Sequence, residues 1–595
     1  MSKSKKRLLI ILGVISIILI VLVFFFNAIV AHTISNKVDK YLAEHPVKNY
    51  QIEYDRVGFN FLNRSARIIG LTYTPNESYI DSMKSTGFKA MIPEVKVGKF
   101  IVSGIDLFDL IKNKEVIIDE IKIKKLELTL NKIEGKAPVK KKKIKLPKNG
   151  SLIPDSVKIK GLNKIHIDKF LVTNSKVEIY NLSSLRTELT NKKINFTIDG
   201  IKLDKKENVK DYLFVEIKDM LLEIDHNIFK TPDNLYEITF DKLSTTFRDK
   251  AISISNFHFK PLYSKAGFSK QIKYQQERYD IRSQQVLISH PDYTKLIQGN
   301  ELDIQNVLIT KPDISIYRDK RLPFPHFKRP LLPHQALKKM AMQLKVDTVQ
   351  IVDGTFVYEE KTDRNSQTLY LDFQKLSGIL SNVTNTKEAL AENSIMKASF
   401  KGRLMGKAPF DIDFRFPMKA KNDTFVFSGT VYGKVPFEIF NKAVFPAAGV
   451  RFDGGTLNKL SFKGGANPKY SKGSMTLLYD NLSLHVVKSD EVSKNKFLSW
   501  SASAMVRKNN PSDGDPPKTA YMVFDRDMEK GFGNFLWKTI LSGLKGSMIV
   551  SMNSINKNKY NAYSKVTTSK PQKNKSDSGN KKKKKKWFWQ KKDKK

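Results

Sequence analysis

Residues 95–125, VKVGKFIVSGIDLFDLIKNKEVIIDEIKIKK, and residues 281–311, IRSQQVLISHPDYTKLIQGNELDIQNVLITK, carry one apolar pattern twice, 186 positions apart and without a gap. Each copy reads as a strand, a polar turn and a second strand. Because self-similarity at a fixed spacing is typical of repeat architectures, the match predicts a duplicated β module. The matching apolar pairs are Phe100 with Val286, Val102 with Ile288, Leu110 with Leu296, Ile111 with Ile297, Val116 with Leu302, Ile118 with Ile304, Ile121 with Val307, and Ile123 with Ile309.

The likeness continues past this window after a small insertion or deletion. Residues 128–132 correspond to 314–320, and residues 166–180 correspond to 345–359. Two long modules therefore share one pattern of strands.

Apolar and polar residues alternate through much of the chain between 95 and 490. One example is Phe410, Ile412, Phe414 and Phe416, which alternate with charged residues. A period of two predicts strands with a single apolar face. Helical patterns are short, at 293–298, 331–342 and 437–443, so they cannot cover so many strands. This leaves a closed sandwich or barrel, or a long curled sheet whose apolar face forms a groove.

The N-terminus contains a stretch without charge, residues 8–31, which follows Lys3, Lys5, Lys6 and Arg7. Its length suits a membrane-spanning helix, and the preceding basic residues predict a cytoplasmic N-terminus. A signal peptide is the alternative, although its apolar region is usually only about 7 to 15 residues long. No other stretch is comparable, so we expect a single span. The residues expected to anchor it are Leu8, Leu12, Ile18, Leu22, Phe25 and Ala31.

The composition, with 40% hydrophobic residues, can support a folded core, and cysteine is absent. The lack of cysteine excludes disulfides, thiolate catalysis and cysteine-based zinc sites. The net charge is +44, and residues 556–595 contribute sixteen Lys against Asp577 and Asp593, or 16 − 2 = +14. A second lysine-rich run lies at 136–150. Both runs are expected to be solvated.

Residues 531–550 have apolar side chains at steps of three and four, which predicts an amphipathic helix weakened by Gly533, Gly543 and Gly546. Two interpretations stay open: the helix caps the open end of the sheet, or it lies at the surface of the opposite membrane. The residues expected to contact a membrane in the second case are Phe532, Phe535, Leu536, Trp537, Ile540 and Leu544.

The C-terminal tail combines the lysines Lys581 to Lys586 with Trp587, Phe588 and Trp589. Basic and aromatic residues together favour an anionic lipid surface. Nucleic acid would attract the same charges, but the expected topology makes it an unlikely partner. A solvated tail with no specific ligand is the remaining alternative.

No residue pattern indicates catalysis. The histidines do not fall at metal-ligand spacing, so no metal or cofactor is expected and lone surface positions are the better interpretation. They include His166, His258, His290, His326 and His334.

Five segments resemble the AsmA-like superfamily of Gram-negative envelope proteins, in particular its Bacteroidota branch. They are YRDKRLP (317–323), FVYEE (356–360), FDGGTLNKLSFKGGANPKYSKGSMTLLYDNLSLHVV (452–487), RKNNP (507–511) and FDRDMEKGFGNFLWKTILSGLKGSM (524–548). The resemblance implies an inner-membrane anchor, a periplasmic array of strands forming a taco-like hydrophobic groove, and a role in phospholipid transfer or outer-membrane maintenance. The lysine-rich tail departs from that family.

We therefore expect a mainly β chain, in which a transmembrane helix precedes an elongated, repetitive, antiparallel sheet curled into a groove, with few short helices. The groove is expected to hold phospholipid acyl chains, and an outer-membrane or envelope protein is a possible partner. An envelope assembly scaffold without lipid transport is the alternative function. The candidate groove residues are Val102, Ile121, Ile123, Ile288, Val307, Ile309, Phe414 and Phe416.

The expected division of the chain follows these features. It comprises a cytoplasmic stub (1–7), the membrane helix (8–31), the first part of the first module (32–135), the linker (136–150), a β-rich segment (151–260), the second module (261–360), a C-terminal groove region (361–525), the amphipathic helix (526–550) and a disordered tail (551–595).

Overall fold

The computed structural model describes most of the chain. The described residues are 3–136, 156–159, 161–205, 212–293, 295, 301–362, 367–486 and 506–568. Within them, the side chains of 3–22, 107, 110, 156–158, 212, 486 and 565–568 are not described.

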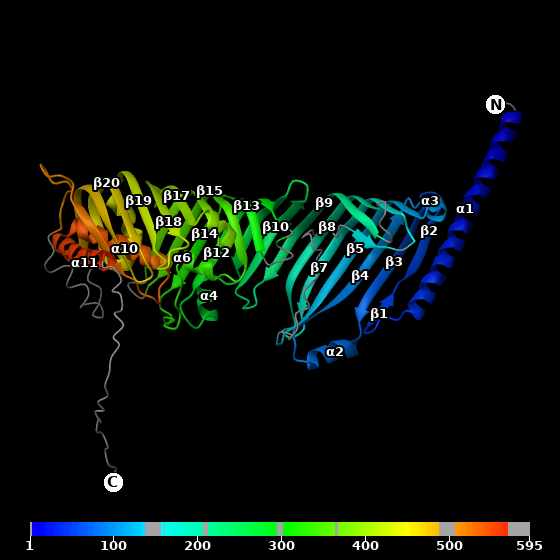
Figure 1. The fold of residues 1–595 in the computed structure, drawn as a ribbon, viewed down its shortest axis with the longest axis horizontal. Coiled ribbons are helices and arrows are strands. Elements are labelled where there is room, and N and C mark those ends of the chain that lie inside the picture. Colours follow the sequence, from blue (N-terminus) through cyan, green and yellow to red (C-terminus); the bar gives the residue numbers. More distant parts are fainter. Residues whose placement is uncertain are drawn as a thin grey trace, which may run out of the picture.

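The described residues form a sheet of 22 strands, with α1 at one end and α10 and α11 at the other (Figure 1). The strands before the repeat of the module are β1 (Tyr50–Glu53), β2 (Arg56–Asn60), β3 (Ser65–Pro75), β4 (Ala90–Ser103), β5 (Glu115–Ile133), β6 (Ser156–Lys158), β7 (Lys164–Asn181), β8 (Arg186–Lys205) and β9 (Tyr212–Lys230). The next strands are β10 (Tyr236–Thr246), β11 (Ala251–Pro261), β12 (Glu277–Pro291), β13 (Glu301–Thr310), β14 (Asp313–Asp319), β15 (Gln343–Lys361) and β16 (Thr368–Thr384). The last are β17 (Ile395–Leu404), β18 (Ala408–Pro417), β19 (Phe425–Pro436), β20 (Val450–Ala466), β21 (Tyr470–Val486) and β22 (Thr519–Asp525).

The helices are short apart from those at the two ends of the described chain. They are α1 (Lys3–Glu44), α2 (Glu77–Ser85), α3 (Leu107–Lys112), α4 (Lys265–Gln271), α6 (Pro333–Lys339), α7 (Lys387–Glu392), η1 (Phe437–Phe440), α8 (Asn441–Ala448), α10 (Phe532–Met548) and α11 (Val550–Thr568). The expected helix near 331–342 is present as α6, with Pro333 in its first turn. The one near 437–443 is present as η1 and α8. Most of the expected helix at 293–298 lies outside the described residues.

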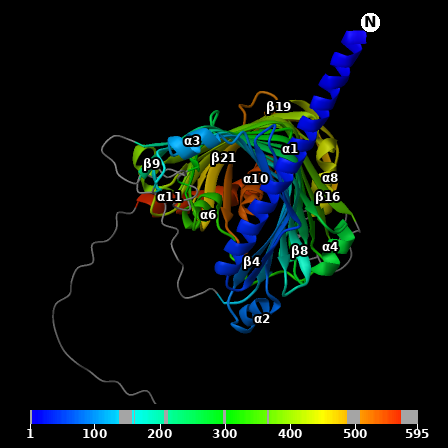
Figure 2. The same cartoon turned by 90° about the vertical axis from the view of Figure 1, so that its right-hand side faces the viewer.

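Strands follow one another across the sheet nearly in chain order. Figure 2, a view from the α1 end, shows that the sheet is curved. Most neighbours are antiparallel, but β7 runs parallel to β5, and β15 runs parallel to both β13 and β14. The expectation of a wholly antiparallel sheet is therefore wrong, and the sheet is mixed. A parallel neighbour requires a connection that returns the chain to the starting end of the strand. The segment 134–163, which contains the lysine-rich linker, joins β5 to β7, and the segment with α6 joins β14 to β15.

The strand registers repeat with the spacing found in the sequence. Phe100 pairs with Ile123 between β4 and β5, and adding 186 to both numbers gives the observed pair Val286 with Ile309 between β12 and β13. The correspondence extends upstream of the sequence repeat, because Tyr50 pairs with Pro75 and Tyr236 pairs with Pro261. The second copy of the module therefore begins at Tyr236, within the segment expected to be a separate β-rich region.

The two copies also share their backbone turns and ring contacts. The Tyr50 ring stacks on Tyr73 with centroids 4.2 Å apart, and Tyr236 stacks on Phe259 at 4.4 Å. Left-handed φ values fall at corresponding positions of the two copies. These matched positions are Arg64 and Lys250, Gly70 and Asn256, Gly104 and His290, Lys125 and Lys311, and Asn174 and Asp353.

The last strand of the sheet does not offer a free edge. The backbone N–H of Tyr521 donates to Asn553 Oδ1 (2.9 Å), and its carbonyl accepts from Asn556 Nδ2 (2.8 Å). The N–H of Val523 donates to Ser542 Oγ (2.9 Å). Side chains of α10 and α11 thus occupy hydrogen-bonding groups of β22 that a further strand would need. The expectation of disorder from residue 551 is wrong for residues 551–568, which belong to α11, while 569–595 lie outside the described residues.

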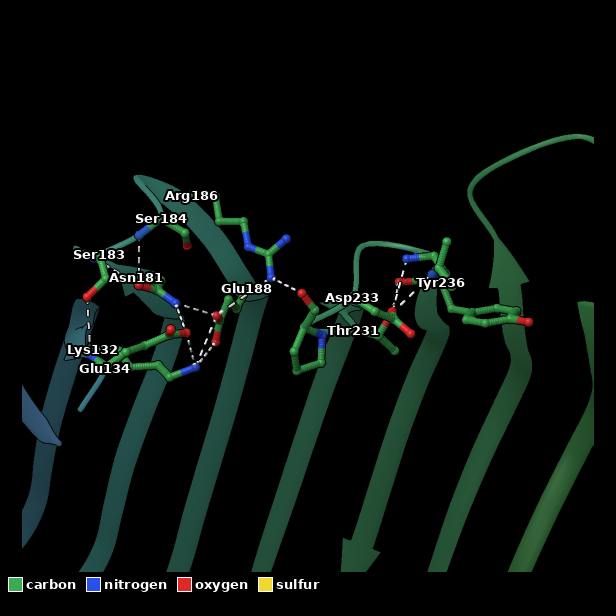
Figure 3. A network of polar contacts seen from close by, with 12 residues as sticks. Lys132, Glu134, Asn181, Ser183, Ser184, Arg186, Glu188, Thr231, Asp233 and Tyr236 are labelled. Carbon is green, nitrogen blue, oxygen red and sulfur yellow. Dashed lines mark hydrogen bonds and ion pairs between the residues drawn. The ribbon is translucent and has the colours of Figure 1, made fainter. Parts of the chain in front are cut away.

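Polar side chains hold together the strand ends of the first module (Figure 3). Glu188, only 7% exposed, accepts hydrogen bonds from Lys132 Nζ (2.8 Å) and Asn181 Nδ2 (2.7 Å). The Asn181 Oδ1 atom accepts from the backbone N–H groups of Ser183 (2.9 Å) and Ser184 (3.1 Å). One asparagine therefore ties the turn between β7 and β8 to the buried carboxylate of the next strand.

The neighbouring strand end is fixed in a similar way. Arg186 donates to the carbonyl of Pro232 (2.7 Å), in the turn between β9 and β10. Within that turn, the Thr231 hydroxyl donates to Asp233 (2.6 Å) and accepts from the backbone N–H of Tyr236 (3.1 Å). The network thus extends to the first residue of the second module.

The network predicts a pH dependence of stability centred on Glu188. Burial would raise the pKa of this carboxyl, but hydrogen bonds from Asn181 and Lys132 outweigh it and hold the pKa below its usual range. Because the folded pKa is the lower one, the ionised carboxylate stabilises the fold above the unfolded pKa of about 4.3, and this contribution is lost as the pH falls through the folded pKa. We expect Glu188→Gln to lower the free energy of unfolding at pH 7 by about 1–2 kcal/mol. A lower thermal unfolding midpoint would measure this loss.

The same variant should lose less stability than the parent chain when the pH is lowered from about 6 to about 3.5, because it lacks one of the carboxyls whose pKa is lowered in the fold. Glu127→Gln, at an exposed position of β5, is the matched control and should follow the parent. Equal acid sensitivity of the Glu188→Gln variant and the parent would contradict the assignment.

Candidate functional site

Direct strand pairing places one residue from each of 19 strands in an unbroken line across the sheet. Apart from Thr245, its members are aliphatic, aromatic, methionine or glycine residues, and none is charged. We call this line the apolar row, and the side of the sheet that carries it the apolar face. The row is Val57, Ile68, Phe100, Ile123, Val172, Phe196, Leu222, Thr245, Ile252, Ile288, Val307, Val349, Leu380, Ala398, Phe414, Phe427, Gly464, Gly473 and Met522.

All eight candidate groove residues lie on this face. Ile123, Ile288, Val307 and Phe414 belong to the row itself. The other four stand two positions along their strands from a row member, and side chains two apart in a strand share a face. These four are Val102, Ile121, Ile309 and Phe416.

The opposite face carries cross-strand ion pairs. Lys193 lies 3.1 Å from Asp225, and Lys242 lies 2.6 Å from Glu223. Each lysine precedes a residue that is paired on the apolar side, so its side chain points the other way. Exposed pairs of this kind contribute little stability, but they keep one side of the sheet hydrophilic.

Burial divides the apolar face into two sections. From β2 to β16, every row member is half-buried except Val172 and Thr245, which are buried. From β17 onward the row is buried apart from half-buried Gly464, and Met522 has no exposed surface. We call the first part the open section and the second part the covered section.

Helix α10 lies over the covered section. The Phe532 ring contacts Phe414 with centroids 5.7 Å apart and Phe425 at 5.8 Å. Phe416 is covered instead by α6, whose His334 ring lies 5.2 Å away. Phe414 and Phe416 therefore belong to the packed core of this end, while the other six candidate groove residues are half-buried in the open section.

The expected amphipathic helix is thus present, and its apolar side packs on the sheet. Phe535 is buried, and Phe532, Leu536, Ile540 and Leu544 pack against the same core as partly buried residues. Trp537 is 37% exposed. This arrangement supports the interpretation that the helix caps one end of the sheet.

Two glycines of α10 allow this close packing. A Cβ atom at Gly543 would lie 2.5 Å from Met522 Cγ, and one at Gly546 would lie 3.3 Å from Ala520 Cβ. The sequence pattern indicated only that glycine weakens the helix. The structure explains why glycine occurs here, because a larger side chain would separate α10 from β22.

His334 is fully buried, so its interpretation as a surface histidine is wrong. Its Nε2–H donates to the carbonyl of Asp423 (3.0 Å), and burial lowers the pKa of the ring. His166 and His258 contact Asp204 (2.9 Å) and Asp280 (2.8 Å). Among the residues that the structure describes, no group of three or more potential ligands could hold a metal ion.

Residues 8–31 lie within α1, whose side chains are described only from residue 23. The anchor candidates Leu8, Leu12, Ile18 and Leu22 therefore lie outside the described side chains, whereas Phe25 is 61% exposed and Ala31 is half-buried. Among the described residues, no helix has the length and hydropathy needed to cross a membrane. The tail residues Lys581, Lys586, Trp587, Phe588 and Trp589 also lie outside the described part.

Matched substitutions in α10 test the packing of the covered section. Gly543→Ala places a methyl group against Met522, so we expect a loss of about 1–3 kcal/mol of stability, the usual cost of overpacking. Gly533→Ala meets no atom within 4 Å and should be neutral or gain up to about 1 kcal/mol from helix propensity. Thermal unfolding and the rate of protease cleavage between β22 and α10 would measure both, and equal effects would contradict the packing argument.

Comparison of the sequence with protein-family models and with curated proteins finds no match. The apolar face and its two sections therefore supply the argument about function.

Proposed function

We propose that this chain is a membrane-anchored lipid-binding protein that holds phospholipid acyl chains on the open section of its apolar face. The observation that carries this proposal is the apolar row, which crosses the sheet without a charged residue and is mostly half-buried before α10 covers it. Exposed apolar surface of this extent is costly in water and usually marks an interaction surface.

A row of this kind suits acyl chains because its attraction is non-directional. Burying one methylene group contributes about 0.8 kcal/mol, so a single chain of ordinary length gains several kcal/mol on contact. Neighbouring row members are chemically alike, so an acyl chain would bind with a similar free energy at adjacent positions. A lipid could therefore be retained and still move between strands.

The distance available is set by the number of strands. The open section, from Val57 on β2 to Leu380 on β16, makes 12 steps between neighbouring strands, which at roughly 4.8 Å per step gives about 58 Å. With α1 as the inner-membrane anchor, as the AsmA-like resemblance implies, the body would lie in the periplasm. The proposal then includes a contribution to phospholipid homeostasis of the outer membrane, with no enzymatic step and no cofactor.

Strand addition by an envelope protein is the main alternative. It would need an unoccupied strand edge, and α10 and α11 already bond to β22. The geometry at this end therefore disfavours strand addition to β22.

Photocrosslinking in the intact cell tests the proposal on the full chain. Benzoylphenylalanine at Ile123 or Val307, both on the open section, should form phospholipid adducts that mass spectrometry of the purified protein detects. The matched control is Lys124, an exposed neighbour of Ile123 that points to the other face. Adducts with proteins alone at Ile123 and Val307 would instead support the scaffold function.

A charge placed between the two crosslinking positions tests whether the face is continuous. Leu222→Asp, in the row on β9, should reduce adducts severalfold at one of the two positions and spare the one on the side from which lipid arrives. Its neighbour substitution Glu223→Asp, on the other face, should leave both unchanged. If Leu222→Asp has no effect at either position, lipid occupies separate local sites and does not move along the face.

A further inference from the structure

The first module carries exposed apolar side chains at its edge beside α1. Leu62, in the turn between β2 and β3, is 78% exposed, and Phe61 beside it is 52% exposed. In α3, Phe108 is 66% and Ile111 is 81% exposed. We call these four residues the apolar tip.

Hydrogen bonds hold the parts of the tip together. The N–H of Ile105 donates to the carbonyl of Arg64 (3.3 Å), which joins the start of α3 to the β2–β3 turn. Asp106 then caps α3 by accepting from the N–H of Phe108 (3.0 Å). These hydrogen bonds therefore fix the two parts of the tip relative to each other.

The tip is also fixed against α1. The N–H of Phe61 donates to Asn27 Oδ1 (2.7 Å), and the rings of Phe61 and Phe26 meet edge to face at 5.2 Å. Asn27 lies inside the uncharged stretch 8–31. Figure 1 shows the N-terminal part of α1 projecting past the sheet edge where α3 lies.

The contact with Asn27 sets how deeply the tip would lie in a bilayer that α1 crosses. Asn27 precedes Ala31 by four residues, which at 1.5 Å per residue is about 6 Å inside the end of the uncharged stretch. Interfacial protein segments bury their apolar side about 5–10 Å into a bilayer. Exposed apolar residues of α1 at the same level, Phe25 and Ile29, make the tip continuous with the helix surface. Lys112, whose Nζ lies 5.0 Å from the Phe108 ring centre, supplies a cation suited to lipid phosphate.

The second module provides an internal control. Strand registers place Arg248 at the position of Leu62 and Phe247 at the position of Phe61. Arg248 lies 3.6 Å from Asp219, and the Phe247 ring packs on Tyr293 at 4.6 Å. The same turn thus has a charged end and a packed aromatic ring where it is remote from α1, so the module fold does not itself require an apolar tip.

We propose that the apolar tip inserts into the surface of the bilayer that α1 crosses, so that the open section begins at the lipid surface. This inference rests on the membrane anchoring included in the proposed function. A phospholipid bilayer is the occupant that fits an apolar tip tied to an uncharged helix, with a lysine beside it. Lipid chains could then pass from the bilayer to the row members Val57 and Ile68 without crossing water.

The absence of cysteine makes a clean test possible in the full chain. Leu62→Cys and Ile111→Cys, each labelled with the fluorophore NBD, are reconstituted into nanodiscs of phosphatidylethanolamine and phosphatidylglycerol. We expect a blue-shifted emission, strong quenching by lipids with a nitroxide on the acyl chain, and weak quenching by aqueous iodide. Arg248→Cys is the matched control at the equivalent turn and should show severalfold stronger iodide quenching.

Two results would overturn the inference. Iodide quenching at Leu62 and Ile111 equal to that at Arg248 would mean that the tip lies in water. Protection from both quenchers would mean that protein covers the tip, such as a second copy of the chain. Neither result depends on the adducts at Ile123 and Val307, so failure of the tip and failure of lipid binding on the sheet are distinguishable.

Discussion

Strand register is the constraint on which the rest of this structure depends. The backbone hydrogen bonds fix which residues stand opposite each other, and a slip of one position would turn every side chain of a strand to the other face. The apolar row exists because 18 successive registers each bring an uncharged residue opposite the last. The cross-strand ion pairs on the other face oppose such a slip, since they would have to enter the apolar side.

Helices at the two ends adapt this sheet to different surroundings. At the C-terminal end, the small residues Gly543 and Gly546 let α10 approach the apolar face and bury it. The asparagines of α11 bond the outer groups of β22, which ends the sheet. At the N-terminal end, α1 contacts the turn after β2 and leaves the apolar face partly exposed. The apolar face is therefore covered at one end and partly exposed toward the other.

The sequence predicted the features that are local or periodic. The repeat at 95–125 and 281–311, the one-faced strands and the helix at 531–550 all follow from spacing, and the structure contains each of them. The parallel pairing of β5 with β7 was missed because about thirty residues separate the two strands in the chain, and alternation within a strand does not indicate which strand it pairs with. The coverage of Phe414 and Phe416 was missed for a related reason, since alternation indicates which side a residue faces but not what lies above it.

Other features can be recognised in the sequence only after the strand registers of the structure are known. Gly70 and Asn256 share a left-handed conformation, and a comparison at a spacing of 186 would have paired them, although their side chains give no hint of equivalence. The burial of His334 depends on α6 meeting Asp423, which is remote in the chain. The apolar tip becomes apparent only when Leu62 is compared with Arg248, its counterpart in the second copy.

The duplication gives this protein a unit of length. From β3 to β11, its counterpart in the second copy, the sheet advances seven strands, or about 34 Å at roughly 4.8 Å each. Because both copies keep the same register and end with compatible strands, a third copy could be inserted without disturbing either end. The length of the apolar face would thus change in whole multiples of this unit.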